Sequence, residues 1–150
     1  MEAPSPARLY AAAVGAFLVA VGIAGFFYSA SFGGPGTIET ALGVLRVNAW
    51  LNLLYGLCGA LGLLLAASVP RAYALAMGFL FTGLAVWGWS IGSGSAILGF
   101  LPAAGGDEAL ALLLGVLGLL AAAGTPAPER RRRRRRARSK ARAKPARQRA

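Results

Sequence analysis

The stretch LYAAAVGAFLVAVGIAGFFYS, residues 9–29, carries no charged side chain and is bounded by Arg8 and by a glycine- and proline-rich run at 33–36. A helix needs about 20 apolar residues to cross the hydrocarbon core of a bilayer. This stretch is apolar around its whole circumference, whereas a helix of a soluble bundle has one apolar stripe. It therefore predicts a transmembrane helix. A cleavable signal peptide ending near residues 29–31 is an alternative, although the apolar core of such peptides is usually about 7–15 residues long.

Three further segments of the same kind follow, at residues 49–69, 72–91 and 109–124. The last is the shortest, and we expect it to be the weakest of the four spans. Together the segments predict an all-α protein, an integral membrane four-helix bundle. A protein with three spans or a re-entrant segment is an alternative, and a soluble fold is a more remote one.

The charge of the chain is separated from its hydrophobic part. The chain has 150 residues, is 57% hydrophobic with a mean hydropathy of +0.59, and yet carries a formal net charge of +11. Nearly all of this charge lies in residues 125–150, which cannot bury apolar surface and repel one another. We therefore expect three parts: a short cytoplasmic N-terminus at 1–8, a four-helix domain at 9–124, and a disordered polybasic tail at 125–150.

The distribution of charge also predicts an orientation. Cytoplasmic loops of membrane proteins are enriched in Lys and Arg. If both termini are cytoplasmic, Arg8, Arg71 and the tail lie inside, while Asp107 lies outside. The predicted location is the plasma (inner) membrane. Aromatic side chains favour the membrane–water interface, and three tryptophans stand near the predicted outer ends: Trp50, Trp87 and Trp89.

Polar residues inside the second segment form the first candidate site. Asn48, Asn52 and Tyr55 recur at helical spacing, so they are expected on one face of the helix. Such a face can bind or conduct a solute, or it can supply hydrogen bonds between helices, which we favour. A second candidate is an ion pair between Arg46 and Asp107 at the outer mouth of the bundle.

The composition excludes several kinds of chemistry. The chain has no histidine and a single cysteine, Cys58, so histidine-based acid–base catalysis, a disulfide framework and a Cys-x-x-Cys metal site are absent. No residues resemble a catalytic, cofactor-binding or metal-binding set. We expect a protein that is not an enzyme and needs no cofactor.

The run LGVLRVNAWLNLLYG, residues 42–56, resembles the hallmark of a bacterial family of small four-helix membrane proteins of unknown function. That family shows an L-G-x-x-x-x-N-P-x-H-N-x-x-H pattern, followed by A-R-x-Y before the third helix and D-N-x-x-H at the start of the fourth. Residues 71–73 and 107–108 are similar to the last two motifs. The resemblance implies the fold, the membrane location and a bacterial source, and it places the histidines of the family at Leu51, Tyr55 and Ala111 of this chain.

The tail is the third candidate site. A cation close to an anionic leaflet gains about 1 kcal/mol, so we expect the tail to bind anionic phospholipid headgroups. Binding to nucleic acid or protein, and an inert tail, are alternatives. The expected contact residues are Arg130, Arg131, Arg132, Arg133, Arg134, Arg135, Arg136, Arg138, Lys140, Arg142 and Lys144.

These observations predict a non-enzymatic multi-pass membrane protein with a structural or interaction role. Its expected partners are the lipid bilayer, anionic headgroups and, through helices rich in small residues, other membrane proteins or further copies of itself. A small oligomeric transporter or channel that uses the Asn48, Asn52 and Tyr55 face is one alternative. A membrane tether for nucleic acid is another.

Overall fold

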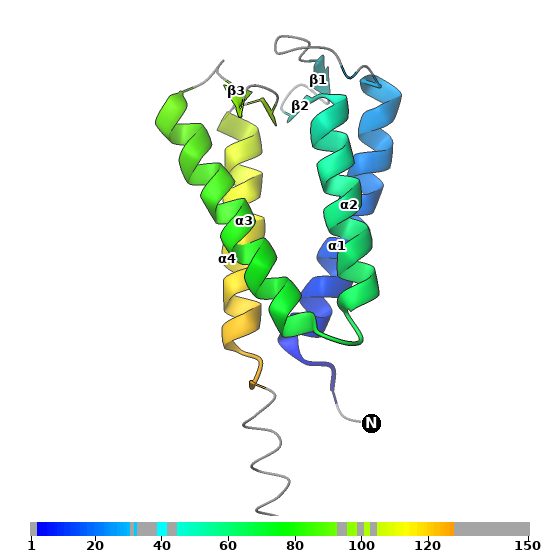
Figure 1. Cartoon of the computed structure of the whole chain (residues 1–150), viewed down its shortest axis with the longest axis vertical. Helices are drawn as coiled ribbons and strands as arrows, with labels where there is room; N and C mark the ends of the chain where they lie inside the picture. Colours follow the sequence, from blue (N-terminus) through cyan, green and yellow to red (C-terminus); the bar gives the residue numbers. More distant parts are fainter. Residues whose placement is uncertain are drawn as a thin grey trace, which may run out of the picture.

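The computed structural model describes residues 3–30, 32, 39–41, 45–92, 96–98, 101–102 and 105–127, with the backbone alone at 39–41, 45–47, 96, 102 and 105. These residues form a bundle of four antiparallel helices (Figure 1), which confirms the predicted helical bundle. The helices are α1 (Pro6–Tyr28), α2 (Ala49–Leu65), α3 (Pro70–Ile91) and α4 (Gly105–Ala123).

Two short antiparallel ladders, which the sequence did not predict, lie in the connections at the upper end of Figure 1. In the first, β1 (Glu39–Ala41) pairs with β2 (Leu45–Val47), so that Thr40 lies opposite Arg46. In the second, β3 (Ala96–Ile97) pairs with β4 (Leu101–Pro102). The two long connections therefore have the same form, a helix followed by a small hairpin and a returning helix.

Each helix begins with a local signal. Proline stands at the first position of α1 and α3, where its missing N–H costs no intrahelical hydrogen bond. The side chain of Asn48 caps α2 by accepting a hydrogen bond of 2.8 Å from the backbone N–H of Leu51. The first turn of α4 contains Asp107 and Glu108, which interact favourably with the positive end of the helix dipole.

The lengths of the helices correct two predicted segments. By length and composition, α1, α3 and residues Gly106–Ala123 of α4 can each cross a membrane, whereas α2, with 17 residues, is shorter. The second segment was expected to reach residue 69, but the chain turns at 66–68 because Pro70 disfavours a helical residue before it. The fourth segment was expected to start at 109, yet α4 begins at Gly105, so α2 and not α4 is the shortest helix.

The helices pack in two close pairs, α1 with α2 and α3 with α4. Glycines allow the backbones to approach. A methyl group at Gly59 of α2 would lie 2.6 Å from the carbonyl oxygen of Gly15 in α1. At Gly115 of α4, a methyl group would collide with Thr82 of α3. In lipid, where apolar surfaces gain nothing by leaving water, such close contacts are a main source of helix association.

The two helix pairs form an internal repeat. The pattern R-x-Y-A-x-A-x-G occurs at residues 8–15, at the start of α1, and again at 71–78, at the start of α3. Positions in α2 also match positions in α4 at one fixed separation along the sequence, as Gly59 and Gly115 do. The identical pairs include Ser5 and Ser68, Arg8 and Arg71, Tyr10 and Tyr73, Ala11 and Ala74, Gly15 and Gly78, Gly25 and Gly88, Gly59 and Gly115, Gly62 and Gly118, and Ala66 and Ala122.

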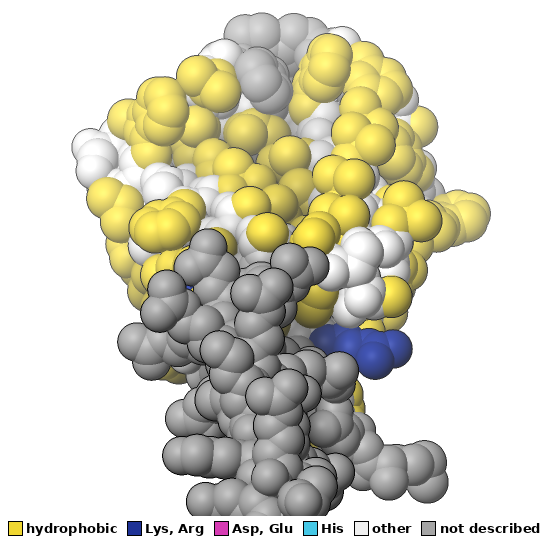
Figure 2. All heavy atoms as spheres, turned by 60° about the horizontal axis from the view of Figure 1, so that its bottom comes forward, with side chains coloured by type: hydrophobic (Ala, Val, Ile, Leu, Met, Phe, Trp, Pro, Cys, Tyr) yellow, Lys and Arg dark blue, Asp and Glu magenta, His cyan; other side chains and the backbone are white. Residues whose placement is uncertain are grey.

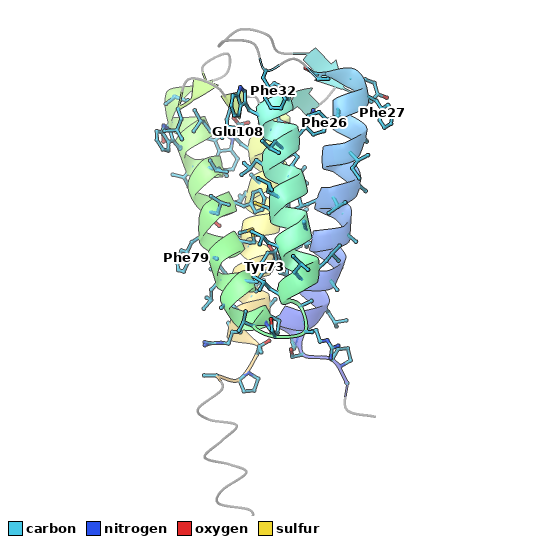
Figure 3. The ribbon with its side chains drawn as sticks, turned by 45° about the vertical axis from the view of Figure 1, so that its right-hand side comes forward. Phe26, Phe27, Phe32, Tyr73, Phe79 and Glu108 are labelled. Carbon is cyan, nitrogen blue, oxygen red and sulfur yellow. The ribbon has the colours of Figure 1, made fainter. Side chains whose placement is uncertain are left out.

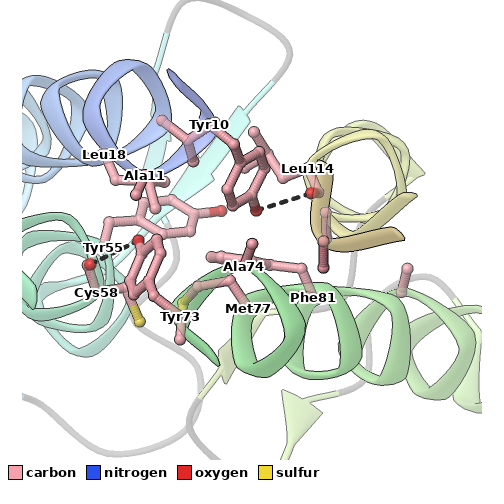
Figure 4. Packing of buried hydrophobic residues seen from close by; sticks show 14 of the residues in the cluster. Tyr10, Ala11, Leu18, Tyr55, Cys58, Tyr73, Ala74, Met77, Phe81 and Leu114 are labelled. Carbon is pink, nitrogen blue, oxygen red and sulfur yellow. Dashed lines mark hydrogen bonds between the residues drawn. The ribbon is translucent and has the colours of Figure 1, made fainter. Parts of the chain in front are cut away.

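Equivalent residues make equivalent contacts between the pairs (Figure 4). The hydroxyl of Tyr10 donates a hydrogen bond of 2.9 Å to the carbonyl of Leu114, across from α1 to α4. The hydroxyl of Tyr73 donates a bond of the same length to the carbonyl of Cys58, from α3 to α2. The two helix pairs are thus related by an approximate two-fold rotation about an axis along the bundle.

The outer surface is apolar, as expected of helices in contact with lipid. Phe27 and Phe79 point away from the bundle (Figure 3) and are 86% and 69% exposed. The buried core combines alanines with larger side chains: Phe81 and Leu18 are fully buried, and Tyr10 and Tyr73 are buried with them. The apolar outer surface supports the assignment of the chain as a membrane protein.

The close contacts predict opposite effects of one substitution at two neighbouring glycines of α2. Gly59→Ala should lower the unfolding midpoint in detergent, because overpacking costs about 1–3 kcal/mol. Gly56→Ala is the matched control, since a methyl group there meets no atom of the described residues within 4 Å. Alanine is the better helix former by about 1 kcal/mol, so this variant should be at least as stable as the wild type. Equal destabilisation by both would contradict the packing.

Candidate functional site

A small pocket lies between the two helix pairs at the end that carries the ladders, and we call it the acidic pocket. Its volume is about 30 Å³, above the roughly 10–15 Å³ that a cavity needs to hold a water molecule. It is lined by Leu51, Tyr55, Phe81, Leu84, Ile97, Leu101, Asp107, Glu108 and Ala111. The lining includes two pairs of equivalent positions, 51 with 107 and 55 with 111, so the pocket lies near the approximate two-fold axis.

The two acidic residues of this pocket are buried. Asp107 is 7% exposed and Glu108 is 4% exposed. The segment expected at 109–124 left both acids before the fourth helix. The structure corrects this expectation, because α4 begins at Gly105 and includes both acids in its first turn.

Glu108 lies in a notch made by a glycine of the neighbouring helix. A methyl group at Gly88 of α3 would lie 2.6 Å from the Cγ and Oε1 atoms of Glu108. Oε2 of the same carboxyl group is buried and has no hydrogen-bond partner among the described residues. Burial of a charge without a partner costs several kcal/mol. The pocket has room for one small ligand beside this oxygen.

The equivalent residue in the first helix pair is Asn52, and it occupies an equivalent notch. A methyl group at Gly25 of α1 would collide with the side-chain amide of Asn52. The Nδ2 atom of Asn52 donates a hydrogen bond of 3.0 Å to the carbonyl of Ser29, which follows α1. The same notch thus holds a bonded amide in one half of the protein and a carboxyl group in the other.

The three polar residues predicted on one face of α2 have separate surroundings. Asn48 caps the helix. Asn52 is fully buried against α1. Tyr55 faces α3, where its ring centroid lies 6.3 Å from that of Phe81. Of the three, only Tyr55 lines the acidic pocket.

The ion pair predicted between Arg46 and Asp107 stays a prediction, because the side chain of Arg46 lies outside the described residues. The strand that contains Arg46, β2, does contact α4, the helix of Asp107. Among the described residues no group of three or more His, Cys, Asp or Glu side chains is suited to a metal ion.

The opposite end of the bundle is basic, and a larger pocket of about 540 Å³ opens there, which we call the basic pocket. Arg8 and Arg71 line it, and Figure 2 shows a dark blue patch of positive charge at this end. The Nε atom of Arg71 donates a hydrogen bond of 3.2 Å to the carbonyl of Ala122 in α4. The tail cations predicted to bind lipid, at positions 130–144, lie outside the described residues.

Thr125 belongs to the bundle, although its composition-based assignment was to the tail. Its hydroxyl oxygen accepts a hydrogen bond of 2.9 Å from the backbone N–H of Ala7 and donates one of 2.8 Å to the carbonyl of Ala121. These bonds tie the start of α1 to the end of α4. Both termini of the bundle therefore lie at its basic end (Figure 1).

A family described as a domain of unknown function (DUF4383) matches residues 8–124, a range that includes nearly all of the four helices. The chain belongs to this family. No curated protein and no solved structure gives a significant match. The match agrees with the expected relation to an uncharacterised family. The three positions at which the resemblance expects histidine, now Leu51, Tyr55 and Ala111, all line the acidic pocket.

Several residues of these pockets were missed at the sequence level. Glu108 was not a candidate, because it was placed outside the helix. Arg8 and Arg71 were used for orientation alone. The repeated R-x-Y-A-x-A-x-G pattern would have shown that these two arginines are equivalent and lie at the same end of the bundle.

The two notches predict reciprocal changes in stability. Glu108→Gln should raise the unfolding midpoint in detergent, because it removes a buried carboxyl group and supplies a donor of the same shape. Asn52→Asp should lower it, because the bond to Ser29 is lost and a carboxyl group is buried. Each change is expected to amount to about 1–3 kcal/mol. A stabilising Asn52→Asp or a strongly destabilising Glu108→Gln would show that the two notches are not equivalent.

Proposed function

We propose that the protein is a non-enzymatic multi-pass membrane protein whose basic end binds the anionic phospholipid headgroups of the cytoplasmic leaflet. The role is structural or one of interaction with partner membrane proteins. The observation that carries the proposal is the collection of positive charge at one end: Arg8 and Arg71 lie there, and the chain with its thirteen tail cations leaves from there. Asp107 and Glu108 lie at the other end.

The proposed location is the plasma membrane of a bacterium, with both termini cytoplasmic, and the separation of charge supports this orientation. Positive charges are retained on the cytoplasmic side during insertion. Cations near an anionic surface gain about 1 kcal/mol each, and the attraction decays within a Debye length of about 8 Å at physiological salt. Thr125 is held at the basic end of the bundle, so the tail begins beside the proposed headgroup layer.

The orientation can be tested with single cysteines in a Cys58→Ala background. Ala3→Cys and Ala127→Cys, both at the basic end, should react with a membrane-impermeant maleimide only when the cytoplasmic face is accessible. Leu98→Cys, at the opposite end and 62% exposed, should react only from the other side. Labelling of Ala3→Cys and Ala127→Cys from outside would overturn the orientation.

The contribution of the tail can be tested in the full chain by replacing Arg130–Arg136 with glutamine. The protein, reconstituted in nanodiscs of neutral lipid, is mixed with vesicles that contain phosphatidylglycerol, and co-flotation is measured at 50–500 mM salt. The wild type should bind at low salt and be released as salt rises, whereas the variant should bind much more weakly. Unchanged binding by the variant would contradict the proposal. Tighter retention of duplex DNA than of vesicles would favour the nucleic-acid tether instead.

The carboxyl group of Glu108 favours one second candidate, a small cation-coupled transporter. Some transporters are built from parallel repeats related by an axis along the membrane normal, with the substrate site between the repeats. Tyr55 and Glu108 line such a position here. Solute or proton flux in proteoliposomes that is lost in Glu108→Gln would support this candidate over the structural role.

A further inference from the structure

The basic pocket is formed by the ends of several segments. The residues before α1, the turn between α2 and α3, the start of α3 and the residues after α4 all contribute to it. Its described lining consists of Ala3, Pro4, Ser5, Arg8, Ala66, Ala67, Ser68, Val69, Pro70, Arg71, Ala72, Leu75, Thr125 and Pro126. At about 540 Å³ it lies within the range of about 300–1,000 Å³ that is usual for small-molecule sites.

The approximate two-fold rotation brings equivalent residues into this pocket. Ser5 and Ser68 are one equivalent pair, and Arg8 and Arg71 are another. The two halves of the protein therefore present the same Ser-x-x-Arg sequence to one cavity from two sides. The pocket, like the acidic one at the other end, lies at the axis of the repeat.

The charge of the pocket is positive. Arg8 and Arg71 are its only charged residues among those described, and none of the described lining residues is acidic. A guanidinium group has five N–H donors in a fixed plane, which suits the oxygens of a phosphate. Arg71 uses one donor, Nε, to bind the carbonyl of Ala122, and this bond holds its guanidinium group at the pocket. The positive ends of the dipoles of α1 and α3 border the same cavity.

The position of the pocket suits a phosphate group carried by a lipid. It lies at the ends of α1 and α3, which are long and apolar enough to span a membrane, so it is at the depth of lipid headgroups. Nine of its fourteen described lining residues are alanine, proline, valine or leucine, which can contact the glycerol and upper acyl carbons of a lipid.

We propose that the basic pocket binds a phosphate group between Arg8 and Arg71, carried either by an anionic phospholipid headgroup or by a soluble phosphate compound. The lipid source rests on the proposed function, which places this end at an anionic leaflet. The pocket itself is independent of the tail, because its two arginines belong to the helix bundle.

The test uses the full chain purified in a neutral detergent, with two probes: short-chain phosphatidylglycerol, with phosphatidylcholine as its neutral counterpart, and inorganic pyrophosphate. Binding is measured by native mass spectrometry for the lipids and by titration calorimetry for pyrophosphate. Selective binding of phosphatidylglycerol supports the lipid source, and binding of pyrophosphate alone supports a soluble source. Binding of neither probe overturns the proposal.

The variants locate the site. Ser68→Asp adds a negative charge to the pocket and should weaken binding by about tenfold or more, whereas Ser68→Asn, of the same shape, should leave it nearly unchanged. Arg8→Gln should weaken binding by about tenfold as well. Its matched control is Arg149→Gln, which removes the same charge from the tail. An equal loss in Arg149→Gln, or full binding in both Ser68→Asp and Arg8→Gln, would overturn the proposal.

The tail variant separates this proposal from the proposed function. Replacement of Arg130–Arg136 by glutamine should strongly weaken vesicle flotation and leave the binding of phosphatidylglycerol or pyrophosphate to the pocket within about twofold. If the tail variant still binds vesicles fully, the tail proposal fails while the pocket is unaffected. If it loses pocket binding to the same extent as Arg8→Gln, the pocket proposal fails.

Discussion

The close approach of helix backbones inside lipid is the constraint on which the rest of the structure depends. Apolar side chains gain nothing by exchanging lipid for protein, so the helices are held by packing and by hydrogen bonds. Gly15 and Gly59 allow this approach between α1 and α2, and Gly78 and Gly115 allow it between α3 and α4. With the backbones so near, single hydroxyl groups such as that of Tyr10 reach carbonyls of the opposite pair.

The same pair of packed helices is used twice, so both halves of the protein contribute to a site at either end of the two-fold axis. At any position on the axis, equivalent residues of the two halves meet, so one residue type in the repeat appears twice in one site. This doubling puts Arg8 and Arg71 in the basic pocket. At the other end the halves have diverged, and Leu51 and Asp107 occupy equivalent places around the acidic pocket. The scaffold is shared, and the chemistry of its two ends differs through side chains alone.

The sequence predicted the helices well and their ends and partners less well. Uniform apolarity reports burial in lipid, so it identified four helical segments, but it cannot show where a helix stops within an apolar run such as 63–69. The two acids led to a predicted start of the fourth helix that was too late, because acidic side chains are favourable inside the first turn of a helix as well as before it. Helical spacing placed Asn52 and Tyr55 on one face, yet α2 contacts both α1 and α3, and the two side chains diverge to different neighbours. The repeated R-x-Y-A-x-A-x-G pattern was available in the sequence and would have predicted the pairing.

Asn52 and Glu108 show that packing fixes the shape of the side chain at this position but not its chemical group. Both side chains fill a glycine notch at equivalent positions, so the scaffold accepts the same shape in each. The amide of Asn52 donates a hydrogen bond to the carbonyl of Ser29, and Glu108 has no such donor. In each notch one buried side-chain oxygen has no hydrogen-bond partner among the described residues, Oδ1 of Asn52 and Oε2 of Glu108. A bundle selected for stability alone would gain by an amide in both notches. The carboxyl group therefore stands at the place where the two halves differ in chemistry and not in fold, and activity that resides in the bundle should depend on this residue first.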